Sequence, residues 1–100
     1  MSDFYETTIG VCRSGQDITF RQAALLLLCR HHDADPTSRQ VAALAAELRI
    51  PKASVTRATD RMALMGYVAR SVPQEDRRRC IVSITVKGRK FLSFIEGGRA

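Results

Sequence analysis

Two groups of polar and cationic side chains stand out in this 100-residue sequence. The first group is Ser54, Thr56, Arg57 and Arg61, and the second is the run Glu75-Asp76-Arg77-Arg78-Arg79. The planar fork of arginine can bond a guanine edge through two hydrogen bonds or enter a narrow, electronegative groove of a duplex. Hydroxyl groups bind phosphate oxygens or contact a thymine methyl group. These residue types therefore indicate contacts to a nucleic acid.

The first group lies on a predicted helix from about Lys52 to Met65. The apolar residues of this segment recur at helical spacing and are expected to face the core: Val55, Ala58, Met62 and Met65. The hydroxyl and arginine side chains fall largely on the opposite side. Pro51 suits the first helical position, where its missing N–H has no helical partner to lose. Gly66 suits the left-handed residue that closes the helix.

Two further helices are predicted before this one. Thr19 with Gln22, and Thr37 with Gln40, have the spacing of a capping box, in which each side chain satisfies a backbone N–H of the first turn. The first helix carries the segment 23–29, which is apolar on nearly all sides, so we expect it to be the buried centre of the domain. A tight turn connects the second helix to the arginine-bearing one.

Two short strands are predicted on either side of the basic loop, at residues 67–70 and 80–84, and Thr85 is expected to cap a last helix ending near Ile95. A compact helix pair followed by an arginine-rich hairpin is the layout of a winged helix-turn-helix. One helix of such a fold can enter a major groove while the hairpin reaches a neighbouring groove or the backbone. The predicted fold class is therefore mainly α with a small β-hairpin wing.

Length and charge agree with this interpretation. One hundred residues suit one small domain, here assigned to residues 19–96, with an N-terminal arm or short helix over 1–18 and a tail over 97–100. Residues 1–35 carry a net charge of −2 and residues 36–100 carry +8, with a sequence pI near 9.9. A basic C-terminal two-thirds favours a polyanionic partner.

An ordered series of segments resembles the MarR family of bacterial regulators. These segments are Ile18-Thr19 with Gln22, residues 41–45 with Leu48, residues 54–57 with Asp60-Arg61-Met62, Gly66-Tyr67-Val68, Asp76-Arg77-Arg78, Val82, Ile84-Thr85 and Gly88. The resemblance covers about residues 18–90. It implies a winged-helix homodimer that binds pseudo-palindromic operator DNA, usually as a repressor.

The resemblance also implies roles for individual residues. It places Ser54, Thr56, Arg57 and Arg61 on the recognition helix. It places Arg78 at the wing tip, where the arginine of the family enters the minor groove, and it gives Asp76 the role of orienting the wing. Only twelve residues follow Gly88, too few for the long C-terminal helices of the family. A smaller dimer seam, formed by the N-terminal arm and the last helix, and a monomer are both open, and so is a small-molecule effector.

Within the predicted site, Arg57 is the best candidate for reading bases because it lies near the start of its helix. Ser54 and Thr56 are expected to contact phosphate or a thymine methyl group. Asp60 is an acid within a basic surface and could pair with Arg57, Arg61 or the wing to hold an arginine fork in place.

The basic wing and the last helix carry further cations. Alternation on a hairpin predicts Arg77 and Arg79 on one side and Arg78 on the other. On the last helix, three basic residues are predicted to be phosphate contacts or solvated charges: Lys87, Arg89 and Lys90.

Other chemistry receives little support. His31-His32-Asp33 lacks the spacing of a metal site, and its histidines suit the negative end of a helix dipole. Cys29 and Cys80 lie in apolar runs, whereas Cys12 beside Arg13 could be reactive if exposed. We find no catalytic, nucleotide-binding or cofactor motif, so we predict no enzyme activity and no cofactor.

The sequence also bears on location and leaves two functional alternatives open. The longest apolar run is seven residues, the N-terminus is polar, and the cysteines form an odd set, which together predict a cytoplasmic protein. The alternatives to sequence-specific regulation are a winged-helix module that binds an acidic protein partner and a nucleoid-associated protein that coats DNA without sequence preference.

Overall fold

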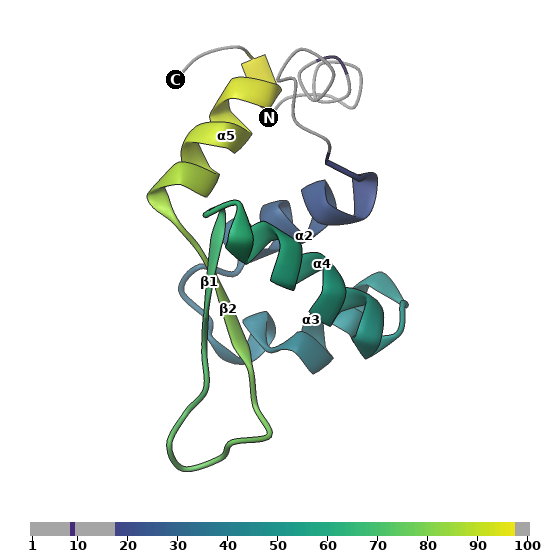
Figure 1. Cartoon of the computed structure of the whole chain (residues 1–100), viewed down its shortest axis with the longest axis vertical. Helices are drawn as coiled ribbons and strands as arrows, with labels where there is room; N and C mark the ends of the chain where they lie inside the picture. Colours follow the sequence, from purple (N-terminus) through teal and green to yellow (C-terminus); the bar gives the residue numbers. More distant parts are fainter. Residues whose placement is uncertain (1–8, 10–17, 98–100) are drawn as a thin grey trace.

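The computed structural model describes residue 9 and residues 18–97 (Figure 1). Its elements in chain order are α2 (Phe20–His31), the 3-10 turn η1 (Thr37–Arg39), α3 (Val41–Leu48), α4 (Lys52–Leu64), β1 (Val68–Ser71), β2 (Ile81–Ile84) and α5 (Val86–Gly97). The helices α2, α3 and α4 pack together, and the hairpin of β1 and β2 extends away from α5 (Figure 1). This arrangement confirms the mainly α fold with a β-hairpin wing. The predicted helix in the arm, apart from Ile9, and Cys12 lie outside the described residues.

Helix α2 is the centre of the domain, as predicted. Its capping box is complete: the Gln22 N–H donates to the Thr19 hydroxyl oxygen at 3.0 Å, and the Thr19 N–H donates to Gln22 Oε1 at 3.0 Å. The core gathers apolar side chains from α2, α3, α4, the hairpin and α5: Leu25, Leu26, Cys29, Val41, Leu44, Ala45, Val55, Ala58, Met62, Tyr67, Val68, Val82, Ile84, Phe91, Leu92 and Ile95. Burial of this apolar surface is the main force that holds the elements together.

The predicted second capping box does not form. The Asp35 carboxylate instead accepts the Thr37 N–H at 3.1 Å and the Ser38 hydroxyl at 2.8 Å, which supports the short turn η1. Gln40 has an extended backbone, with φ −66° and ψ 146°, and forms an isolated antiparallel bridge with Ile81. Helix α3 therefore begins only at Val41. The prediction was wrong because pairing with β2 holds residue 40 in an extended conformation, and sequence spacing carries no sign of that pairing.

Residues with special backbone conformations lie on both sides of α4. Arg49 has the left-handed conformation at the end of α3, with φ 58°, and Pro51 is the residue before α4 rather than its first residue. Gly66 has φ +83°, as predicted for the residue that closes this segment. Strands β1 and β2 then pair antiparallel, from Val68 opposite Ile84 to Ser71 opposite Ile81.

Helix α5 is tied to the end of α4 and to α2. The Thr85 hydroxyl accepts the Gly88 N–H at 3.0 Å, so it caps α5 as predicted, and it donates to the Gly66 carbonyl oxygen at 2.6 Å. At the other end of α5, both oxygens of Glu96 accept from the Arg30 guanidinium, at 2.6 and 2.7 Å. These bonds hold α5 across the top of the domain in Figure 1, on the side opposite the wing tip. No helix of the described part is long and apolar enough to cross a membrane.

Cys29 provides a pH-dependent test of the core. Burial raises the pKa of this thiol from 9.0 to about 11, although the nearby charge of Arg39 lowers it in part. A raised pKa means that the folded state favours the neutral thiol, so this contribution to stability is complete below pH 9 and lost as pH rises to about 11. We expect the free energy of unfolding to fall by up to about 2–3 kcal/mol over that interval. Urea unfolding of Cys29→Ala should lack this part of the pH dependence, and equal slopes for both proteins would contradict it.

Candidate nucleic-acid interface

The arginine-bearing face of α4 is open to solvent. Thr56, Arg57 and Arg61 are exposed and Ser54 is half-buried, whereas the opposite face supplies core residues. Thr59 is the polar exception on the buried side, and its hydroxyl donates to the carbonyl oxygen of Val55 at 2.9 Å. Helix α4 therefore presents three exposed cationic side chains, Lys52, Arg57 and Arg61, while its opposite face is fixed in the core.

The segment between β1 and β2 is irregular, so its side chains do not alternate as predicted. Arg77 and Arg78 are exposed and Arg79 is half-buried. Arg78 and Arg79 both line one hollow, so neighbouring residues share a side here. Residues 72–80 form turns and irregular backbone rather than strand, which explains why the period of two fails.

Asp76 contacts the wing arginine that follows it. Its Oδ1 accepts the backbone N–H of Arg78 at 3.1 Å and lies 3.6 Å from the Arg78 Nε. Because the Arg78 side chain is almost fully exposed, this ion pair contributes little to stability. The contact with the backbone restrains the turn that carries the arginine.

A hollow of about 270 Å³ lies between the start of α3, the outer face of α4 and the root of the wing. Four of its lining residues are cationic, namely Lys52, Arg70, Arg78 and Arg79. Among the residues that the structure describes, no carboxylate lines this hollow. Helix and wing thus contribute positive charge to one concave surface, and such a surface attracts a negatively charged ligand.

Arg70 is the site residue that sequence reasoning missed. It lies on β1, and its guanidinium forms an ion pair with the Asp60 carboxylate on α4. Of the partners predicted for Asp60, the one that pairs with it in the structure is a residue of the wing, not Arg57 or Arg61. The sequence carried one signal, since Arg70 falls on a predicted strand next to the arginine-rich loop.

The Asp60–Arg70 pair should orient side chains more than it stabilises the fold. Both side chains are partly exposed, so water screens their attraction. We expect Asp60→Asn to lower the free energy of unfolding by less than about 1 kcal/mol. Chemical denaturation measures this directly, and a loss several times larger would mean that the pair is a structural element of the core.

Other predicted cations make contacts within the domain. The Lys87 ammonium donates to the Met65 carbonyl oxygen at 2.9 Å, and Arg89 forms an ion pair with Asp33 at 2.7 Å. Lys90 is exposed.

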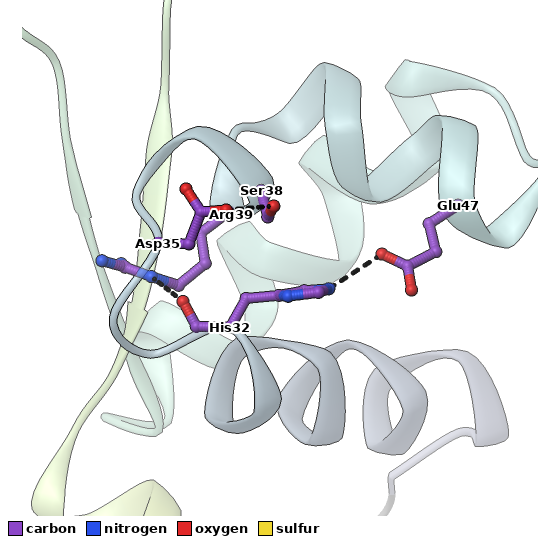
Figure 2. Close-up of polar contacts among 5 residues, drawn as sticks. All are labelled: His32, Asp35, Ser38, Arg39 and Glu47. Atoms are coloured by element: carbon purple, nitrogen blue, oxygen red, sulfur yellow. Dashed lines mark hydrogen bonds and ion pairs between the residues drawn. The ribbon is translucent and has the colours of Figure 1, made fainter.

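Near the end of α2, His32 Nε2 lies 3.0 Å from Glu47 Oε1 (Figure 2). Within the described ranges, no three potential ligands are grouped to hold a metal ion.

Comparisons with known proteins agree on one family. A sequence model of the MarR family matches residues 16–79. Among solved structures, BldR from Sulfolobus solfataricus is 26% identical, with a TM-score of 0.65 over 82% of this chain and 55% of its own. MarR is 26% identical, with a TM-score of 0.66 over 79% of this chain and 55% of its own. A mutant of S. aureus MepR bound to an oligodeoxyribonucleotide is 23% identical, with a TM-score of 0.72 over 79% and 56%.

The chain therefore spans little more than half the length of these three structures. A comparison with curated proteins gave no match. MarR-family proteins are transcription regulators rather than enzymes.

Proposed function

The chain belongs to the MarR family, and from this premise we propose that it is a sequence-specific DNA-binding regulator that acts as a transcriptional repressor. One observation carries the proposal: α4 and the wing line the same concave surface, and among the described residues every charged side chain on that surface is cationic. DNA is the polyanion that such a helix-and-wing surface fits, because a helix occupies the major groove while an extended arm reaches a neighbouring groove. The S. aureus MepR structure bound to an oligodeoxyribonucleotide supports this choice of ligand.

In this proposal α4 enters the major groove. Arg57 reads a base edge, and Arg61 and Thr56 contact the flanking backbone or bases. Ser54, half-buried near the start of α4, binds phosphate and sets the register of the helix on the duplex.

The wing carries the second set of contacts. Arg78 enters the minor groove, with Asp76 and its hydrogen bond to the Arg78 backbone holding the turn, while Arg77 and Arg79 bind phosphates beside it. Asp60, through its ion pair with Arg70, holds the root of the wing against α4.

We further propose that two copies act together on a pseudo-palindromic site. Helix α5 exposes two large apolar side chains, Val86 and Phe94, which a second copy could cover. Sedimentation at micromolar concentration should show a dimer, and Phe94→Glu should shift it toward the monomer, because it places a charge in the proposed seam. A wild-type monomer at these concentrations would contradict this part of the proposal.

Salt dependence tests DNA binding itself. Fluorescence anisotropy with a mixed-sequence duplex, titrated from about 50 to 200 mM salt, should show affinity falling steeply, because each phosphate that the protein neutralises releases counterions. The expected log–log slope is about −0.9 per contact. An affinity independent of salt, or no binding at the lowest salt, would exclude DNA as the ligand of this surface.

A further inference from the structure

Arg39, the last residue of η1, is a buried cation with 8% of its surface exposed. In the part of the chain that the structure describes, it forms no ion pair. Its Nε donates to the His32 carbonyl oxygen at 3.0 Å (Figure 2), and its Nη1 donates to the Val82 carbonyl oxygen at 2.8 Å and to the Ser83 hydroxyl at 2.7 Å. Moving a guanidinium out of water is costly, and charge-assisted hydrogen bonds offset that cost only in the right geometry.

The three acceptors belong to two different parts of the molecule. His32 is the C-cap residue that follows α2, the central helix of the domain. Val82 and Ser83 lie on β2, the strand that runs from the wing back into the core (Figure 1). The fork of Arg39 therefore connects the rigid body of the domain to the strand that sets the direction of the wing.

The next two residues extend the same connection toward the wing tip. Gln40 forms the antiparallel bridge with Ile81, and the Val41 N–H donates to the Cys80 carbonyl oxygen at 2.9 Å. With its amide oxygen turned toward Arg79, Gln40 also accepts from the Arg79 Nε at 3.2 Å and Nη2 at 2.9 Å. Residues 39–41 thus lie antiparallel to residues 80–82, which form the root of the wing. We call these three residues the wing clamp.

We propose that Arg39 is a positioning residue for DNA recognition: its fork, at the inner end of the wing clamp, fixes the wing relative to α4, so that Arg78 and Arg57 meet the duplex together. The bridge from Gln40 and the backbone bond from Val41 each hold one residue of the segment 80–81, whereas Arg39 bonds both β2 and the C-cap of α2. Lysine cannot replace it, because an ammonium on a flexible stem lacks the planar fork. The expected effect on DNA binding rests on the proposed function, whereas the effect of Arg39 on the position of the wing can be tested without DNA.

Amide hydrogen exchange, read residue by residue by NMR, tests the structural part. In Arg39→Met and in the milder Arg39→Lys, we expect the amides of β1 and β2 and the Val41 amide to lose at least about tenfold in protection, while those of α2 and α4 keep theirs. Arg21→Met, at an exposed position on α2, is the control and should change neither set. Equal loss throughout the domain would show a purely structural role, and unchanged exchange in both variants would also overturn the proposal.

A double-mutant cycle tests the consequence for DNA. We expect Arg39→Lys to weaken binding on the order of tenfold, but by a clearly smaller factor when Arg78→Ala has already removed the minor-groove contact of the wing. Combined with Arg57→Ala it should still weaken binding about tenfold, since α4 does not depend on the clamp. Full additivity in both cycles would contradict the positioning role. If the wild-type protein binds no DNA, the proposed function fails, and hydrogen exchange alone decides the role of Arg39.

Discussion

Gly88→Ala is expected to destabilise the domain by at least about 2 kcal/mol, although alanine is the better helix former. By propensity alone this substitution within α5 would stabilise the helix by about 1 kcal/mol. A Cβ at this position, however, would lie 2.3 Å from the Tyr67 carbonyl oxygen and 2.8 Å from Ile84 Cγ1. The backbone oxygen cannot rotate away, so α5 would have to move off the root of the hairpin.

Gly66→Ala is the matched comparison in urea unfolding. Within the described part of the chain, a Cβ there would meet the flexible side chain of Lys87 alone, at 3.5 Å. The cost therefore comes from the backbone conformation at φ +83° and should be about 1 kcal/mol. If Gly88→Ala proved neutral, or less damaging than Gly66→Ala, the close approach of α5 to Tyr67 would be wrong.

Arg57→Ala is expected to relax base preference at one position of each half-site, with a loss of about 1–3 kcal/mol in discrimination. Arginine can bond two acceptors of guanine at once, and alanine leaves those acceptors without a partner. Affinity for unrelated duplexes should change much less, because contacts to phosphate supply most of the non-specific binding.

Lys90→Ala provides the control for that experiment. Lys90 is an exposed cation on α5, away from the base-reading helix, so its loss should weaken all sequences alike and leave the preference intact. Competition binding between matched and singly substituted duplexes measures both effects. Unchanged discrimination in Arg57→Ala would assign base reading to another residue.

Local chemistry explains which features could be predicted from the sequence. The capping box at Thr19, the left-handed Gly66 and the cap at Thr85 depend on residues within four positions of one another, so their spacing was informative. The apolar period of α4 likewise identified which side faces the core, and therefore which arginines are exposed.

The features that were missed depend on contacts between segments distant in the sequence. Arg39 is buried because acceptors more than forty residues away lie beside it, whereas an arginine in the first turn of a predicted helix is otherwise expected to be exposed. Asp60 pairs with Arg70 because β1, which carries Arg70, packs against α4. Arg49 takes a left-handed conformation that propensity assigns mainly to glycine and asparagine.

The central claim is sequence-specific recognition of DNA, and selection of bound duplexes from a random pool tests it most directly. At about 150 mM salt the Debye length is about 8 Å, so diffuse attraction to the phosphate backbone is damped. We expect one motif to be enriched, with two half-sites separated by about one helical turn, as two copies of α4 in successive major grooves would require. A pool that stays random after selection would contradict the account, and the basic surface would then be better explained by DNA coating without sequence preference or by an acidic protein partner.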